Sequence, residues 1–221
     1  MIRLSFSTRL FHGIFLFLAL MLVFGCQGNF RKNYLQLKNP MQNDDFNTAV
    51  VILDKAKEKN IYTERDRVMY WLNRGSLLHY AKRYKESNEV LVQAEKSIQD
   101  LFTKSISRGA ASLLTSDAVT HYDGEDYEKI LLYLYTSLNQ LMLGNSSDAL
   151  VEARAADELI KKMKIYYEKE GNIGTLYTQD AFILWLIGTL YEMDNEPNDA
   201  YLAYKDALTV MKKDYAGFYG T

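Results

Sequence analysis

Apolar residues recur along most of the chain at spacings of three and four positions, and no long stretch alternates between apolar and polar residues. The first pattern is typical of amphipathic helices, whereas alternation would indicate strands. Only two prolines occur, at positions 40 and 197. The sequence therefore predicts an all-α protein with about seven helices, at positions 44–59, 65–81, 84–105, 125–143, 147–169, 178–193 and 197–213.

The remaining segments are expected to connect or flank these helices. Residues 26–43 are interpreted as a tether with at most one weak helical turn before Pro40, and residues 214–221 as a C-terminal tail. The 107–124 connection is less regular and has room for a short helix. The sequence Glu-Gly-Asn-Ile-Gly at 170–174 indicates a clear break, because glycines accept backbone conformations that end a helix. The helical domain is thus predicted to cover residues 44–213.

The predicted helices come in pairs that share a pattern of small and large residues. In 184–208 a large apolar residue precedes Gly188 and Tyr191, and after a short turn the second helix carries Ala200 and Tyr204. A small residue on each helix lets the two helices approach closely, while the larger residues fill the space beside them. This order resembles the tetratricopeptide repeat.

Three further segments carry parts of the same pattern. They are 71–94, with Gly75 and Ser87; 133–156, with Ser137 and Ala149; and 44–56, which matches only a second helix. The positions equivalent to Ala200 are spaced by 38, 62 and 51 residues, whereas a regular repeat has about 34. The fold class predicted is a degenerate tetratricopeptide-like helical-hairpin array, an α-solenoid. The alternative is a generic helical bundle.

The N-terminal segment has the features of an export signal. Residues 1–25 contain two arginines and no acid, and an apolar run of 11 residues ends at Phe24. That run is too short to span a bilayer, which needs about 20 residues. Cys26, the only cysteine, follows Gly25 and resembles the bacterial lipobox, although Phe24 is bulkier than the usual residue there. The resemblance implies removal of residues 1–25, palmitate on Cys26 and an anchor in the outer membrane. A retained membrane anchor and an ordinary signal are the alternatives.

Composition narrows the class of partner. Removal of residues 1–25 takes away two basic residues and no acid, so the formal net charge moves from −2 to −4. A mildly acidic chain is not expected to bind nucleic acid or to hold a membrane surface by charge. No cysteine then remains for a disulfide, so the core must hold the fold. No sequence motif for binding a cofactor or for a catalytic nucleophile occurs. We therefore expect no cofactor and no enzymatic activity.

One cluster of acids, in His121–Lys129, raises the question of a chemical site. It contains Asp123, Glu125, Asp126 and Glu128 beside His121. Acids favour the first turn of a helix, because they oppose the positive end of the helix dipole. We expect a helix to begin near Gly124 with Asp123 as its cap, and Tyr127 to face inward. His121 with Asp123 could bind a metal, but no second histidine lies nearby, so the prediction is no metal and no catalytic site.

Two segments resemble a family of poorly characterised bacterial repeat lipoproteins. Its members share Tyr-x-Gly-x-x-Tyr-Glu and Ala-x-Val-Glu-x-Arg, which match residues 122–128 and 149–154 here. The resemblance covers about 65–160 and implies an envelope role beside other small lipoproteins, some related to curli secretion or to penicillin-binding-protein activators. No activity is implied. We predict that Glu152 or Arg154 bonds the turn at 122–128 and that this contact has a structural role. We call this set of residues the structural lock: Tyr122, Gly124, Tyr127, Glu128, Glu152 and Arg154.

The first helices of such an array usually line a concave face. By resemblance, the residues of this face are Met69, Leu72, Ser76, His79, Leu131, Leu134, Leu138, Trp185, Thr189 and Glu192. This set is largely apolar, which argues against a clamp for a terminal carboxylate. The groove could accept an apolar segment of a partner, or residues 107–124 or the C-terminal tail could fill it.

The function predicted is a lipid-anchored, non-enzymatic scaffold that binds other envelope proteins or lipoproteins, on the periplasmic face of the outer membrane. Exposure at the cell surface, as an adhesin or a host-interaction lipoprotein, is the second interpretation. A carrier of an apolar ligand is the third, and a hydrolytic enzyme would need a polar cleft that the sequence does not indicate.

Overall fold

The computed structural model describes residues 27–108, 121–169 and 179–216. In these ranges it contains eight α-helices and no strand, which confirms the all-α helical-array prediction with one helix more than the seven expected. None of the helices in the described ranges is long and apolar enough to cross a membrane. The signal segment with Cys26, residues 109–120 of the irregular connection, the 170–174 break and residues 217–221 lie outside these ranges.

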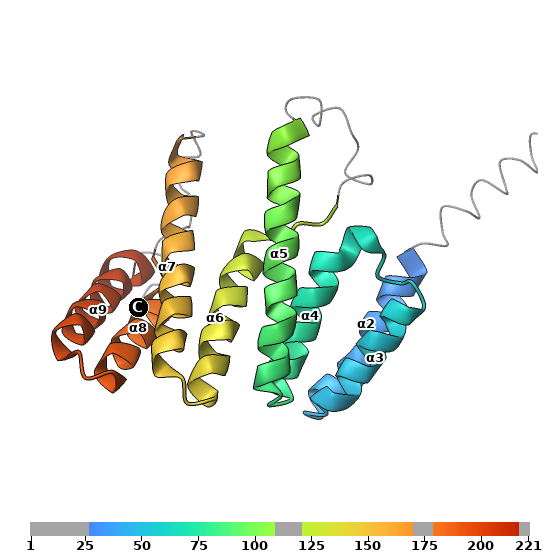
Figure 1. Cartoon of the computed structure of the whole chain (residues 1–221), viewed down its shortest axis with the longest axis horizontal. Coiled ribbons are helices and arrows are strands. Elements are labelled where there is room, and N and C mark those ends of the chain that lie inside the picture. Colours follow the sequence, from blue (N-terminus) through green and yellow to red (C-terminus); the bar gives the residue numbers. More distant parts are fainter. Residues whose placement is uncertain (1–26, 109–120, 170–178, 217–221) are drawn as a thin grey trace, which may run out of the picture. The chain divides into compact units, whose positions relative to one another are not determined.

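The chain divides into two units, the first ending at Thr63 and the second beginning at Glu64. The first unit contains α2 (Gln27–Gln42) and α3 (Phe46–Glu58). The second begins with a short 3-10 turn (Glu64–Asp66) and continues with α4 (Arg67–Tyr80), α5 (Tyr84–Arg108), α6 (Asp126–Met142), α7 (Ser146–Lys169), α8 (Ala181–Met193) and α9 (Pro197–Val210) (Figure 1).

The segment expected to be a tether is a helix, so that prediction is wrong. In α2 the buried positions are Asn33, Leu37 and Pro40, spaced four and three residues apart, and the helix packs against α3. Pro40 lies inside the last turn of the helix, where it has no backbone N–H to donate to the carbonyl four residues earlier. Helix α2 is therefore the missing first helix of the hairpin whose second helix the sequence indicated at 44–56.

All four hairpins turn in the same way. The residue five positions before the small residue of the second helix has a positive φ in each: Asp44 (55°), Lys82 (60°), Gly144 (83°) and Asn195 (61°). The next residue donates its backbone N–H to a carbonyl five positions earlier, with N–O distances of 2.8 to 2.9 Å in the four turns. These bonds satisfy carbonyl groups that the helix end would leave free. The four hairpins therefore share one turn geometry, despite their irregular spacing.

The two helices of each hairpin approach at the small residues that the sequence pattern marked. The hydroxyl of Ser87 donates to the carbonyl of Gly75 at 2.8 Å, and that of Ser137 donates to the carbonyl of Ala149 at 2.7 Å. A side chain at Gly75 would collide with Leu91, since an added Cβ would lie 2.5 Å from its Cδ2 atom. In these two pairs the contact positions are twelve residues apart, and Gly188 and Ala200 have the same separation in the sequence, so a common register relates Gly75, Ser137 and Gly188.

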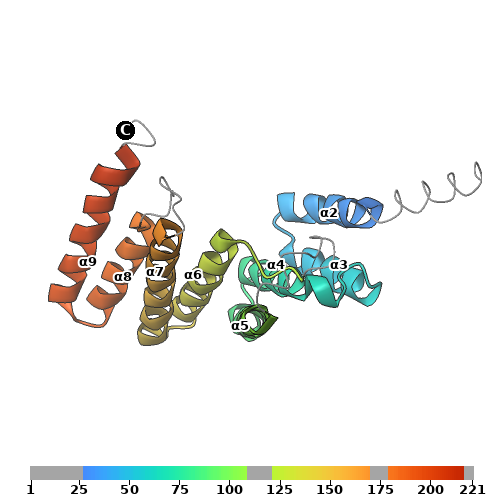
Figure 2. The ribbon, with the colours of Figure 1, turned by 90° about the horizontal axis from the view of Figure 1, so that it is seen from above.

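Successive hairpins of the second unit stack through two apolar cores. One forms where α6 packs on α4 and α5, around Val68, Leu91 and Leu132. The other forms where α8 packs on α6 and α7, around Ala153, Ile160 and Leu190. Figure 2 shows α6, α7, α8 and α9 side by side in chain order.

The C-terminal end differs from the expected tail at 214–221. A wide helical turn, Met211–Tyr215, continues α9. The hydroxyl of Tyr215 accepts a hydrogen bond from the backbone N–H of Ala181 and donates one to Asp180, each at 3.2 Å. Asp180 also caps α8 by accepting from the N–H of Ile183 at 2.9 Å. Residues through Tyr215 therefore belong to the folded domain.

Candidate functional site

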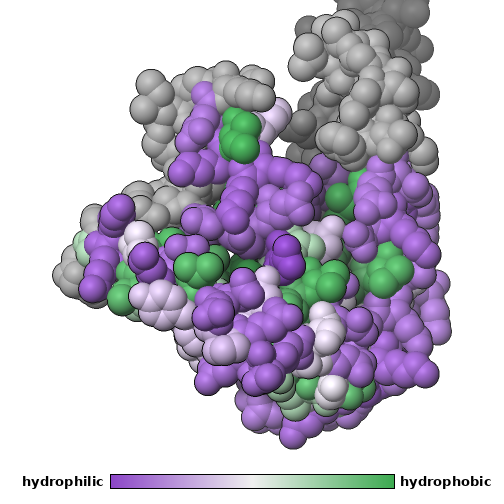
Figure 3. Space-filling view, turned by 60° about the vertical axis from the view of Figure 1, so that its left-hand side comes forward, coloured by the Kyte–Doolittle hydropathy of each residue, from purple (hydrophilic) through white to green (hydrophobic). Residues whose placement is uncertain are grey.

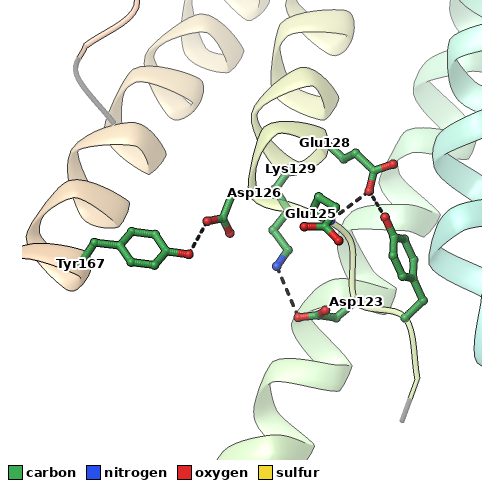
Figure 4. A network of polar contacts seen from close by, with 7 residues as sticks. Asp123, Glu125, Asp126, Glu128, Lys129 and Tyr167 are labelled. Atoms are coloured by element: carbon green, nitrogen blue, oxygen red, sulfur yellow. Dashed lines mark hydrogen bonds and ion pairs between the residues drawn. The ribbon is translucent and has the colours of Figure 1, made fainter. Parts of the chain in front are cut away.

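The turn that precedes α6 is built around the Glu128 carboxylate (Figure 4). Glu128 accepts a hydrogen bond from the Tyr122 hydroxyl and another from the backbone N–H of Glu125, the latter at 2.9 Å. Glu125 and Glu128 together form a capping box at the start of the helix, which satisfies two backbone donors reciprocally. Gly124 has a φ of 88°, a value that favours glycine. Tyr122, Gly124 and Glu128 thus belong to one turn with a structural role.

The other acids of this cluster have separate partners. Asp123 pairs with Lys129 at 3.3 Å, and Asp126 accepts from the hydroxyl of Tyr167 on α7 at 2.5 Å (Figure 4). Asp123 is not the helix cap that we expected, because Glu125 is the N-cap and the helix begins at Asp126. Within the described residues no three His, Cys, Asp or Glu side chains are grouped so that they could hold a metal ion.

The predicted bond from Glu152 or Arg154 to this turn is wrong. In the part of the chain that the structure describes, the side chain that reaches the turn from α7 is Tyr167, four helical turns beyond Arg154. Glu152 instead lies near Glu95 of α5. Burial, followed by the negative charges of Glu95 and Asp148, raises the pKa of Glu152 above its ordinary range. Arg154 is exposed.

We expect Glu128→Ala to lower the free energy of unfolding by about 1–2 kcal/mol, because it removes the capping box and leaves the Tyr122 hydroxyl without its acceptor. Arg154→Ala is the matched control and should change it by less than about 0.5 kcal/mol, since an exposed side chain is lost. Urea denaturation of both variants measures the difference. If Arg154→Ala lowered the free energy of unfolding more than Glu128→Ala, the result would support the original prediction that Arg154 bonds this turn.

The predicted concave face is only partly a groove. Leu72, Ser76 and Leu131 line a groove of 130 Å³ between α4 and α6, together with Tyr127 and Tyr135. We call this the α4/α6 groove. Leu131 is 37% exposed and Tyr127 is 61% exposed, so the expectation that Tyr127 faces inward is wrong. This part of the face is open to a partner.

The other predicted groove residues have different roles. Leu134 and Leu138 pack against the core between α6, α7 and α8. His79 bonds the side chain of Asn139 at 2.7 Å, and Met69 is half-buried. Thr189 and Glu192 both accept hydrogen bonds from the hydroxyl of Tyr204 on α9. Five of these six residues, all except Met69, therefore make contacts within the fold.

Trp185 lines a second and larger groove, which we call the α8/α9 groove. It has a volume of 450 Å³ and an almost wholly apolar lining, with Phe182 and Trp185 on α8 and Leu208 and Met211 on the other side. Phe182 and Leu208 were not among the predicted site residues. They are apolar at positions that the hairpin pattern does not bury, and that is the signal by which they could have been identified.

Tyrosines give the α4/α6 groove its chemical character. The hydroxyls of Tyr80 and Tyr135 hydrogen-bond each other at 3.0 Å, and the ring of Tyr135 lies 4.9 Å from that of His79. Burial and the bond to Tyr80 raise the pKa of Tyr135, which keeps its hydroxyl protonated. Aromatic side chains with a polar end are common where proteins bind each other, because they combine apolar area with a hydrogen-bonding group.

Comparison of the sequence with models of known protein families gives no match, and comparison with curated proteins gives none either. The resemblance to repeat lipoproteins therefore rests on the sequence segments within about 65–160, among them 122–128 and 149–154. It remains a prediction.

Proposed function

We propose that this chain is a lipid-anchored, non-enzymatic adaptor of the bacterial envelope, which binds a partner protein in the α4/α6 groove. The observation that carries the proposal is the row of Tyr127, Leu131 and Tyr135 on the first helix of a hairpin, beside Leu72 and Ser76 of the preceding one. Tyr127 and Leu131 are exposed and Tyr135 is half-buried. Helical-hairpin arrays commonly use this face for binding.

The size of the groove favours a protein partner over a small molecule. Its volume is 130 Å³, whereas sites for drug-sized ligands have about 300–1,000 Å³. A groove of this size has room for a single large side chain. The partner is therefore expected to insert one apolar or aromatic residue as an anchor, with flanking contacts to the tyrosine hydroxyls.

Photocrosslinking in cells tests this proposal. A photoreactive residue at Leu131 should form an adduct with one envelope protein, and the adduct should disappear when Tyr127→Asp is added. The same residue at Val151, which is 65% exposed on α7, is the control. Equal labelling from both positions, or adducts only within the chain, would contradict an adaptor that uses this groove.

The lipid anchor is tested separately. Metabolic labelling with palmitate should mark the parent chain and not Cys26→Ser, and the substituted chain should leave the outer-membrane fraction. Labelling that persists in Cys26→Ser would overturn this part of the proposal, because the chain has only one cysteine.

A further inference from the structure

The α8/α9 groove is the third of three equivalent surfaces in the second unit. Each surface, which we call a socket, combines one position of a first helix with three positions of the following second helix. The members of each socket lie at the same distances along the sequence from Gly75, Ser137 and Gly188 respectively. The first socket is Leu72, Leu91, Ala94 and Ile98, the second is Leu134, Ala153, Ala156 and Ile160, and the third is Trp185, Tyr204, Ala207 and Met211.

The next helix of the array fills each of the first two sockets. Helix α6 packs on the first through Leu132 and Tyr135. Helix α8 packs on the second through Ile183, Leu186, Ile187 and Leu190. These four residues of α8 are spaced i, i+3, i+4 and i+7, which places them on one face of the helix.

The third socket lacks such a cover among the described residues. Ile160 of the second socket is 3% exposed, whereas its equivalent Met211 is 54% exposed. Trp185 and Leu208 are each 50% exposed beside it. Figure 3 brings this end of the second unit forward and shows hydrophobic residues in patches within a mainly hydrophilic surface. The socket thus continues the interface that joins the hairpins.

Charge on the rim of this socket narrows what can occupy it. Lys205 on α9 and Lys212 on the helical turn that follows it are exposed and lie beside the row of Tyr204, Leu208 and Met211. On the α8 side of the socket, Glu192 already accepts a hydrogen bond from the Tyr204 hydroxyl. Two copies of α9 packed about a two-fold axis would present the same lysines to each other. Like charges oppose such a contact, and acidic residues on the occupant would favour it.

We propose that the α8/α9 groove receives an amphipathic helix of another protein, with apolar residues at i, i+3, i+4 and i+7 and acidic residues beside that stripe. The apolar spacing follows from the way α8 fills the second socket, and the acidic flank follows from Lys205 and Lys212. This inference does not depend on the adaptor function of the α4/α6 groove, because it concerns a different surface.

Fluorescence of Trp185 tests the proposal directly. The chain has two tryptophans, so Trp71→Phe leaves Trp185 as the only one. The probes are two synthetic helical peptides with the same leucine stripe, one flanked by glutamates and the other by lysines. We expect the glutamate peptide to shift the Trp185 emission to the blue and to bind about fivefold or more tightly than the lysine peptide at low salt. Charge reversal by Lys205→Glu with Lys212→Glu should invert that order.

A pair of leucines on α9 provides matched variants. Leu208 lines the groove, whereas Leu202 is 54% exposed and lies outside it. Leu208→Asp should weaken binding of the glutamate peptide about tenfold or more, and Leu202→Asp should leave it unchanged. Circular dichroism of both variants checks that they fold, which is expected because neither side chain is buried.

Three results would overturn the proposal. In the first, neither peptide shifts the emission, or Leu208→Asp binds as well as the parent. In the second, sedimentation shows a dimer that Leu208→Asp dissociates, which would make a second copy of the chain the occupant. In the third, the glutamate peptide binds only after deletion of residues 217–221, which would make the C-terminal residues the occupant.

Discussion

Asn139→Ala is expected to lower the free energy of unfolding by about 3 kcal/mol, because it removes a buried group that hydrogen-bonds three side chains. Asn139 is fully buried. Its amide nitrogen donates to Ser87 at 2.9 Å and to Asn88 at 2.7 Å, and its oxygen lies 2.7 Å from Nδ1 of His79. For a chain of this size the loss corresponds to a melting temperature lower by about 6–12 °C.

The position of Asn139 explains why one residue matters so much. It lies on α6, whereas His79 belongs to α4 and both Ser87 and Asn88 to α5. The bonds therefore join the first hairpin of the second unit to the next one. Ser87 in turn donates to the carbonyl of Gly75, so the same network also fixes the close approach of α4 and α5. Alanine at 139 would leave these polar partners without their hydrogen bonds in a buried place.

Thermal and urea denaturation of Asn139→Ala measure the loss. Asn73→Ala is the control, since Asn73 is exposed on α4 and its loss should cost less than about 0.5 kcal/mol. Similar stability of the two variants would show that water or a rearranged side chain replaces the Asn139 bonds, and the network would then not hold the hairpins together.

The sequence predicts the hairpins of the second unit because their signals are local. Gly188 and Ala200 permit close approach of two helices, and Pro197 is placed at the first turn of α9, where its fixed φ suits a helix. The repeated turn needs only a residue that tolerates a positive φ, and glycine, asparagine, aspartate and lysine supply it in the four copies. That variety conceals the repeat from a search for one motif.

Helix α2 was missed for an identifiable reason. Its buried positions carry Asn33, Leu37 and Pro40, so only one of the three has an aliphatic side chain of the usual kind. A polar residue and a proline at two of the three core positions remove the apolar periodicity that indicates a helix. Only the position of the second helix, at 44–56, implied that a first helix precedes it.

The candidate site was predictable where it depended on one turn, and not where it depended on packing between helices. Tyr122, Gly124 and Glu128 act within seven residues. The cap itself was placed at Asp123 and not at Glu125, which forms the capping box with Glu128. Which face of α6 lies open cannot be deduced in this way, because apolar residues occur on several sides of that helix. Leu134 and Leu138 meet α8, and Leu131 does not, as a consequence of how the third hairpin stacks.

The stability of the chain should fall steeply above about pH 10, because three tyrosines are held protonated in the folded state. Burial, followed by interaction with Glu128, raises the pKa of Tyr122 above its usual range. Burial and the nearby Glu95 carboxylate do the same to the pKa of Tyr133, and burial and Tyr80 to that of Tyr135. All three side chains are half-buried within the stacked hairpins of the second unit.

The direction of the effect follows from proton binding. In the unfolded chain these tyrosines ionise near pH 10, whereas in the folded chain they keep their protons to a higher pH. Their contribution to stability is therefore fully present below pH 10 and is lost as the pH rises through the range between the unfolded and folded pKa values. Each tyrosine contributes up to about 1.4 kcal/mol per pH unit to the slope in that range.

The triple variant Tyr122→Phe, Tyr133→Phe and Tyr135→Phe tests this account through the slope of unfolding free energy against pH, measured with urea between pH 8 and pH 11.5. The variant is expected to be less stable at neutral pH, because it lacks the hydrogen bonds to Glu128, Glu95 and Tyr80. Its slope above pH 10 should nevertheless be shallower than that of the parent.

Phenylalanine at Tyr127, Tyr166 and Tyr201, which are 60–65% exposed, is the control and should leave the slope unchanged. All three proteins have the same lysines, so the comparison isolates the tyrosines. Equal slopes in the parent and the first variant would mean that hydroxide reaches these side chains in the folded protein.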